Sequence, residues 1–337
     1  MVCVILNRDR ALKELKEFKE LTTMDSAMGI LSEKVAIVTG SGRGIGRGHA
    51  LQLAKAGAAV VINDLDAAEA EKVVQEIRQL GGRAIADTSN IATKAGAYGM
   101  VERCVNEFGK IDIMLANAGI ARDKTFLKMS EEDFDLVMDV HVKGTFLCHQ
   151  AAALQMTAQG NGGVLLSTVS AAHFGNFGQT NYSAAKGAIA SMTYTLALEL
   201  ARFGIRVNAI SPTGTTRLSD TYVGPDGKQH PMPYIDPELN GPMIVYLCSD
   251  QGNYITGQIF GTGGNRILLL NHPKYGPAMY MPNGWTIADV EKHFKATLGN
   301  QLEPYGITKP AYKHYGGVLS PNQLTQKKET AATEAVI

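Results

Sequence analysis

The sequence lacks the features of a disulfide-bonded, zinc-binding or membrane-spanning protein. Its 337 residues include only four cysteines, Cys3, Cys104, Cys148 and Cys248, which are far apart and form no C-x-x-C pair. Neither a disulfide framework nor a metal site is therefore expected. No segment approaches the roughly 18 to 20 apolar residues of a membrane span, and the first residues lack the apolar core of a signal peptide. We expect a cytoplasmic protein with reduced thiols.

An excess of charge is also absent, because 32 Lys and Arg residues balance 32 Asp and Glu residues. No basic run is interleaved with aromatic residues, so there is no electrostatic reason to expect nucleic acid binding. The C-terminal Ala-Val-Ile is not a peroxisomal signal of the S-K-L type. The hydrophobic fraction of 45% is enough for a large buried core. These features favour a globular protein with a small-molecule ligand.

Short apolar runs alternate with segments of helical length from Lys34 onward. Such runs are typical of strands buried on both faces. They lie at residues 35–38, 59–63, 84–86, 111–116, 164–167, 205–210 and 258–260. The alternation predicts an α/β fold with a doubly wound parallel sheet of about seven strands, whose ligand crevice lies at the carboxyl ends of the strands.

The two ends of the chain fall outside this pattern. The spacing of apolar residues at 8–21 predicts a short amphipathic helix within residues 1–28. We interpret residues 1–28 as the product of an upstream translation start or as a fusion remnant, and the alternative is a helix that covers a partner subunit. Residues 29–266 are the expected sheet domain, and residues 267–337 are a C-terminal extension. The Thr286 cap and the apolar spacing after it predict one helix in this extension, which could pack across a subunit boundary, and its last residues are expected to be loose.

A glycine-rich loop directly follows the first apolar run and opens a helical segment. Gly40, Gly44 and Gly46 have the spacing G-x-x-x-G-x-G, with Arg43 and Ile45 between them. Glycines allow the backbone to turn sharply and to approach a pyrophosphate, and the following helix N-terminus offers free N–H groups. The loop therefore predicts a dinucleotide site.

Asp64 closes the second apolar run, where a carboxylate can accept a hydrogen bond from the 2′-hydroxyl of the adenosine ribose. The same carboxylate would repel a 2′-phosphate, although Arg43 is a cation in the adjacent loop. This arrangement favours NAD over NADP. The alternatives are that Asp64 only caps a helix and that Arg43 only points to solvent.

Tyr182 and Lys186 lie four residues apart in a helical segment and so share one face. An ammonium beside a phenol favours the phenolate and lowers the pKa of the phenol, which would make Tyr182 a general acid/base. The alternative is an ordinary surface pair.

With the glycine loop, Asn117-Ala118-Gly119 and the Tyr182–Lys186 motif in this order, the sequence resembles the short-chain dehydrogenase/reductase family over about residues 31–264. The resemblance implies a Rossmann fold, proton transfer by Tyr182, ribose binding by Lys186, a substrate-capping segment at 213–240, and a homodimer or homotetramer. It implies cofactor binding by Gly40, Arg43, Gly44, Ile45, Gly46, Asp64, Asn90, Ile91, Asn117, Ala118, Gly119, Tyr182, Lys186, Pro212 and Gly214.

Three positions depart from the family pattern. The family's serine usually stands thirteen residues before the tyrosine, where this chain has Val169. Counting along the preceding strand places Ser170 in this role instead, with Thr168 as the other candidate hydroxyl and Ser167 after it.

The second departure is His141, which occupies the position of the family's proton-relay asparagine. It could hold a water beside Lys186, and its protonation would make activity more sensitive to acid. The third is Asn90-Ile91, which stands where many members carry Asp-Val against the adenine.

His141 and the segments 121–126, 175–182 and 211–218 are similar to the (3R)-hydroxyacyl-CoA dehydrogenase units of multifunctional enzymes. This similarity implies NAD-dependent oxidation of a secondary alcohol on a 3-hydroxyacyl-CoA or a hydroxysteroid. An NADPH-dependent ketone reductase and a dinucleotide-binding regulatory protein are the alternatives.

Overall fold

The computed structural model describes residues 29–216 and 234–305, which form two compact units. The first unit carries the sheet and ends at Leu270, and the second begins at Asn271. The predicted helix at residues 8–21 and most of the predicted substrate-capping segment lie outside the described residues.

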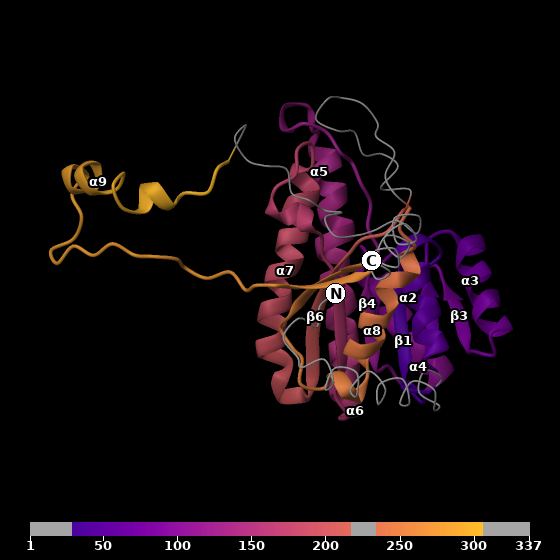
Figure 1. Ribbon diagram of the computed structural model, residues 1–337. Helices are drawn as coiled ribbons and strands as arrows, with labels where there is room; N and C mark the ends of the chain where they lie inside the picture. The colour runs from indigo at the N-terminus through magenta and orange to yellow at the C-terminus, as the bar shows by residue number, and fades with distance from the viewer. Residues whose placement is uncertain (1–28, 217–233, 306–337) are drawn as a thin grey trace, which may run out of the picture. The chain divides into compact units, whose positions relative to one another are not determined.

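Within the described part of the chain, eight strands form one sheet in the order β3-β2-β1-β4-β5-β6-β7-β8 (Figure 1). The strands are β1 (Val35–Thr39), β2 (Ala59–Asn63), β3 (Ala84–Asp87), β4 (Ile113–Ala116), β5 (Gly163–Thr168), β6 (Ile205–Pro212), β7 (Ile259–Gly263) and β8 (Arg266–Leu270). The strands β1 to β7 are parallel. The strand order reverses between β1 and β4, which is where a doubly wound sheet binds its ligand. The predicted fold is confirmed.

The antiparallel strand β8 is an addition to the predicted strands. It follows a turn at Gly263 and Gly264, whose φ angles of 127° and 59° suit glycine, and it pairs with β7. The predicted start of the C-terminal extension, residue 267, lies inside this strand. The apolar run after the glycine pair was the available signal for this hairpin.

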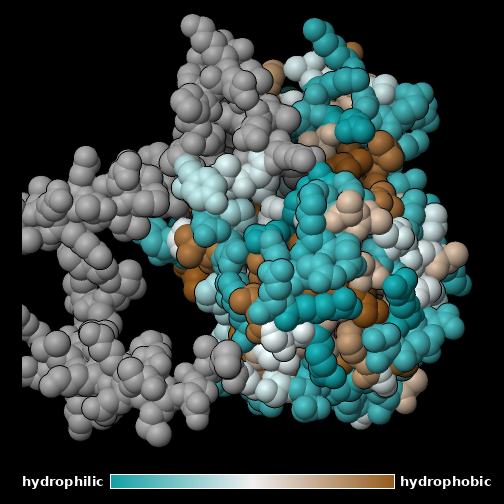
Figure 2. Space-filling model, turned by 90° about the vertical axis from the view of Figure 1, so that its right-hand side faces the viewer, coloured by the Kyte–Doolittle hydropathy of each residue, from teal (hydrophilic) through white to brown (hydrophobic). Residues whose placement is uncertain are grey.

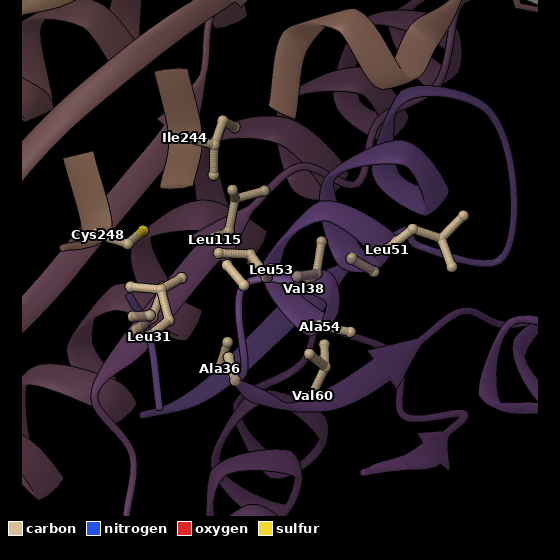
Figure 3. Packing of buried hydrophobic residues seen from close by; sticks show 14 of the residues in the cluster. Leu31, Ala36, Val38, Leu51, Leu53, Ala54, Val60, Leu115, Ile244 and Cys248 are labelled. Carbon is tan, nitrogen blue, oxygen red and sulfur yellow. The ribbon is translucent and has the colours of Figure 1, made fainter. Parts of the chain in front are cut away.

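Helices cover both faces of the sheet, so its central strands β1, β2 and β4 are buried along their whole length. The helical segments are α2 (Gly44–Lys55), α3 (Ala67–Gln79), α4 (Lys94–Phe108), α5 (Glu131–Met138), the π turn η2 (Asp139–Lys143), α6 (Gly144–Gln159), α7 (Thr180–Leu200) and α8 (Gly241–Cys248). Val38 of β1 belongs to the cluster that contains Leu53 of α2 and Ile244 of α8 (Figure 3). Its neighbour Ile37 belongs to the opposite cluster, with Met156 of α6. This alternation is the strand period of two.

The second unit contains α9 (Ile287–His293) at the place where the sequence predicts a helix. Thr286 Oγ1 accepts a hydrogen bond from Asp289 N at 3.2 Å, and Asp289 Oδ2 accepts one from Thr286 N at 3.0 Å. This reciprocal capping fixes the start of α9. No helix in residues 29–216 or 234–305 is long and apolar enough to cross a membrane.

Candidate functional site

Tyr182 and Lys186 lie in the first turns of α7, close to the carboxyl end of β5. The Lys186 side chain is buried, with 2% of its surface exposed, and its Nζ lies 5.5 Å from the centre of the Tyr182 ring. Nζ donates a hydrogen bond to the Thr168 carbonyl at the end of β5, at 2.6 Å. The structure therefore brings the predicted pair together and ties it to the sheet.

The titration of this pair differs from the expectation of a lowered phenol pKa. Burial raises the pKa of Tyr182 to about 12, a hydrogen bond with Ser170 lowers it, and the charge of Asp123 raises it. Burial also lowers the pKa of Lys186 to about 7. In the protein alone the lysine is therefore no permanent cation above neutral pH, and desolvation outweighs its attraction for the phenolate.

The three candidate hydroxyls before Tyr182 have different partners. Ser170 forms the hydrogen bond with Tyr182, and its Oγ also accepts one from Ala172 N at 3.2 Å. The Thr168 hydroxyl lies 3.5 Å from Asn117 Oδ1, and the buried Ser167 hydroxyl lies 2.7 Å from His149 Nε2. Val169, at the family's usual serine position, is buried in an apolar cluster. Of these side chains, Ser170 is the one that influences the pKa of the Tyr182 phenol.

His141 lies in the π turn η2 and contacts Tyr182 edge to face, with ring centroids 5.3 Å apart. Its Nε2 lies 3.0 Å from Ile120 N and 2.8 Å from Ile120 O, directly after the Asn117-Ala118-Gly119 motif. A Cβ on Gly119 would lie 2.3 Å from His141 Cε1, so the imidazole packs tightly against this glycine. Nδ1 is buried and has no hydrogen-bond partner among the described residues.

The electrostatics of His141 correct the expected acid sensitivity. Burial and the nearby Lys186 charge lower the pKa of His141 to about 3. The imidazole is therefore neutral over the whole physiological range and adds no positive charge to the site.

The glycine loop has the geometry of a phosphate cradle. Gly40 has a φ of 60°, and a Cβ at Gly46 would lie 2.2 Å from the Gly40 carbonyl, so both positions require glycine. Arg43, the N-cap of α2, makes no side-chain capping bond, which leaves the first N–H groups of α2 for a ligand. These observations fit a dinucleotide pyrophosphate next to Gly44 and Ile45.

Asn117 joins the end of β4 to this loop. Its Nδ2 donates to the carbonyls of Thr39 and Gly40 at 3.0 and 3.1 Å. Thr39 Oγ1 accepts hydrogen bonds from Asn117 N and Ala118 N at 3.0 and 3.1 Å. The motif after β4 and the loop after β1 are thus held together by hydrogen bonds, and we call these residues, 39–40 and 117–118, the floor of the site.

Asp64 lies beside the glycine loop, as the sequence predicts for a ribose ligand. Its Oδ2 accepts a hydrogen bond from Gly42 N and its Oδ1 accepts one from Asp66 N, both at 3.0 Å. Arg43 forms ion pairs with Asp66 and, at 3.9 Å, with Glu69. The guanidinium therefore does not simply point to solvent.

The adenine contact at Asn90-Ile91 stays a prediction, and the structure shows where the two side chains lie. Asn90 is exposed, and its Oδ1 accepts a hydrogen bond from Ala92 N at 3.0 Å, while Ile91 is buried against Gly144. The buried Asp87 at the end of β3 accepts a hydrogen bond from Asn63 Nδ2 at 2.8 Å. Sequence reasoning missed this pair, although an acid that ends a buried strand was a usable signal.

Pro212 and Gly214 lie at the carboxyl end of β6, where a Cβ on Gly214 would approach Ile45 Cγ1 to 3.3 Å. The fully buried Asn240 holds this segment, because its Nδ2 donates to Thr213 O at 3.1 Å and its Oδ1 accepts from Thr262 Oγ1 at 2.7 Å. Sequence reasoning missed Asn240, since its partners are distant in the chain.

The sequence model of the short chain dehydrogenase family matches residues 34–222. The chain is 40% identical to the peroxisomal multifunctional enzyme type 2 of Drosophila melanogaster over 235 residues, which are 66% of this chain and 38% of that protein. It is 38% identical to the (2S)-[(R)-hydroxy(phenyl)methyl]succinyl-CoA dehydrogenase subunit of Thauera aromatica over 248 residues, which are 72% of this chain and 99% of that one.

A solved structure is similar over a larger share of the chain. The crystal structure of a short chain dehydrogenase from Mycobacterium avium superimposes with a TM-score of 0.74 and 35% sequence identity. The match covers 84% of this chain and all of the other one.

Proposed function

The chain belongs to the short-chain dehydrogenase/reductase family and is an oxidoreductase, and on this premise we propose that it interconverts a secondary alcohol and a ketone with NAD. The proposed substrate is a (3R)-3-hydroxyacyl-CoA or a related hydroxyacyl thioester, with a hydroxysteroid as the second candidate. The observation that carries the proposal is the buried Lys186, whose Nζ lies 5.5 Å from the centre of the Tyr182 ring, together with Ser170, which lowers the pKa of the Tyr182 phenol.

In the oxidation direction, Tyr182 in its phenolate form accepts the proton of the substrate hydroxyl, and Ser170 donates a hydrogen bond to the substrate oxygen. The carbinol carbon loses a hydride, and its single bond to oxygen becomes the C=O double bond of the ketone. A bound nicotinamide dinucleotide supplies the hydride acceptor in this family. The alcohol thus loses one hydride and one proton, and the proton leaves the site through Tyr182.

Other residues of the site position these groups. We infer that Lys186 binds the nicotinamide ribose, that Asn117 keeps the floor of the site in place through Thr39 and Gly40, and that His141 orients the segment after Gly119. Only the unpartnered Nδ1 of His141 is free for the proposed contact with a relay water.

The preference for NAD rests on the charges beside the proposed ribose site. Asp64 is ordered by Gly42 N, and Asp66 and Glu69 already pair with Arg43. A 2′-phosphate would therefore meet three carboxylates before it met a free cation. An NADPH-dependent ketone reductase is the second candidate, because Arg43 lies in the glycine loop.

The acyl-CoA class is supported by the name of the Thauera aromatica relative, a succinyl-CoA dehydrogenase subunit, and by exposed apolar side chains in two loops, one of which precedes Tyr182 in the chain. Phe126, Leu127 and Phe177 are 73%, 94% and 88% exposed. Their two loops are joined by a hydrogen bond from Lys124 N to Gly178 O at 2.9 Å. Large exposed apolar side chains of this kind favour contact with a substrate that has an apolar chain or ring system.

The test is NADH formation from a panel of (3R)- and (3S)-3-hydroxyacyl-CoAs and hydroxysteroids. We expect the (3R)-thioesters to react fastest and Tyr182→Phe to lower kcat by at least about 10³-fold while NADH still binds. The control is Tyr98→Phe, which removes a phenol hydroxyl that donates a hydrogen bond to Gln150 on the surface. Normal turnover by Tyr182→Phe, or no turnover of any secondary alcohol by the unmodified protein, would contradict the proposal.

A further inference from the structure

The cofactor selectivity of the chain depends on more than Asp64. The loop that precedes α3 places further charges beside the glycine loop, on the side of the molecule that Figure 2 views, where hydrophilic residues predominate. Asp66 caps α3, and its Oδ1 accepts a hydrogen bond from Glu69 N at 3.3 Å. Its second oxygen is therefore free for Arg43.

Arg43 is held between two carboxylates. Its Nη2 pairs with Asp66 Oδ2, and its Nε lies 3.9 Å from Glu69 Oε2. The side chain of Arg43 is 33% exposed, so most of its surface is covered. The Glu69 N–H group and the Arg43 guanidinium hold the pKa of Asp66 below its usual range, so this carboxylate is charged at neutral pH.

The same carboxylates lie next to the proposed ribose position. A Cβ on Gly42 would lie 2.7 Å from Asp64 Oδ2 and 3.0 Å from Glu69 Cβ, so the loop, the ribose acid and α3 meet at one glycine. Here Asp64, Asp66 and Glu69 outweigh the two cations Arg43 and Lys72, which pairs with Glu69. A 2′-phosphate placed here would find a net negative field.

We propose that Asp66 and Glu69 are specificity-determining residues, which exclude a 2′-phosphorylated adenosine by holding Arg43 and by their own charge. This inference rests on the proposed use of NAD and extends it. Asp64 selects the ribose hydroxyl, whereas the other two carboxylates neutralise the one glycine-loop cation that could bind a phosphate. The chain would then carry an NADP-binding arginine in a masked form.

The test is the double variant Asp66→Asn/Glu69→Gln. Asparagine still caps a helix and glutamine suits its first turn, so α3 is preserved. The variant leaves Arg43 and Lys72 against Asp64 alone, which reverses the sign of the local charge. The probes are adenosine 2′,5′-bisphosphate and 5′-AMP in calorimetric titrations, with NADPH and NADH measured by fluorescence.

We expect the affinity ratio of the 2′-phosphorylated to the unphosphorylated ligand to rise by at least about tenfold. The gain should shrink in high salt. Adding Arg43→Ala to the double variant should abolish it. The matched control is Glu71→Gln, an exposed acid of α3 that bonds Gln75 rather than Arg43.

A ratio equal to that of Glu71→Gln, or a gain that persists without Arg43, overturns the inference while the proposed function stands. An unmodified protein that binds NADPH more tightly than NADH overturns both. Retained NADH binding by the double variant shows that its site is folded.

Discussion

Lys186 Nζ lies 5.5 Å from the centre of the Tyr182 ring, and its hydrogen bond goes to the Thr168 carbonyl rather than to the phenol. The lysine is therefore held by the sheet and faces the ring of the tyrosine. In the protein alone this geometry leaves both groups mainly uncharged in mildly alkaline solution, with the pKa of Tyr182 raised to about 12 and that of Lys186 lowered to about 7 by burial.

The buried lysine should make stability depend on pH. Between pH 7 and its ordinary pKa of 10.5, the unfolded chain binds a proton at Lys186 that the folded chain does not, so the free energy of unfolding rises with pH. Lys186→Met should therefore stabilise the protein by roughly 1–4 kcal/mol at pH 6, and by less at pH 10. Urea unfolding at both pH values measures this, and an equal effect at both would contradict a buried ammonium.

Ser170 should be the hydroxyl that serves Tyr182. Ser170→Ala removes the hydrogen bond that lowers the phenol pKa, so we expect kcat to fall by about 10²–10³-fold. Thr168→Val is the matched control, because Lys186 binds the backbone carbonyl of Thr168, which this change keeps. A larger loss of kcat in Thr168→Val than in Ser170→Ala would assign the role to Thr168.

Buried histidines should make the fold sensitive to acid. His49 is fully buried without a hydrogen-bond partner among the described residues, and burial lowers its pKa to about 3. The unfolded chain binds an extra proton between pH 6.5 and 3, so stability is lost as the pH falls through this range. His49→Leu should raise the free energy of unfolding at pH 4.5. This gain should exceed the effect of the same substitution at pH 7 by roughly 2 kcal/mol.

His149 offers the comparison for that measurement. Burial lowers its pKa to about 4, but its Nε2 bonds the Ser167 hydroxyl at 2.7 Å. In His149→Leu the free energy of unfolding should fall less as the pH falls. At pH 7 the variant should be less stable than the unmodified protein, because the Ser167 hydroxyl loses its buried hydrogen-bond partner. If neither leucine variant changes the pH dependence of unfolding, the buried imidazoles do not control it.

The glycine cradle should tolerate no side chain at residue 46. An alanine Cβ would lie 2.2 Å from Gly40 O and 2.5 Å from Asn117 Nδ2, so Gly46→Ala should lower the melting temperature and abolish NADH binding. Gly99 in α4 has nothing within 4 Å of an added Cβ. Gly99→Ala should instead stabilise the protein by about 0.5–1 kcal/mol and leave NADH binding intact.

Local sequence patterns were sufficient for most of the sheet. Strands such as β1 and β2 are buried on both faces, so their apolar runs and the glycine loop after β1 are visible without a structure. The strand β8 was missed because its residues do not alternate between apolar and polar. Three of them, Ile267, Leu268 and Leu269, are apolar and yet exposed. An apolar run in an extension does not by itself indicate an edge strand.

The site was predictable where chemistry follows from spacing, as for Tyr182 and Lys186. It was not predictable where contacts between residues far apart in the sequence determine which side chain lies in the site. The choice among Ser167, Thr168 and Ser170 depends on the path of the chain after β5, and the bonds of Asn240 reach segments 22 and 27 residues away. The pKa directions also depend on burial, which spacing does not report.

The π turn at η2 has a consequence for insertions and deletions. The helical residues run without a gap from α5 through η2 into α6, and a π turn holds one residue more than an α-helical turn, so loss of Val140 would let η2 adopt regular α-helical geometry. The faces of α5 and α6 would stay in place, while side chains inside η2 would change direction by up to about 100°. His141 would swing away from Ile120, and a single missing codon far from the glycine loop would dismantle the proton-transfer centre.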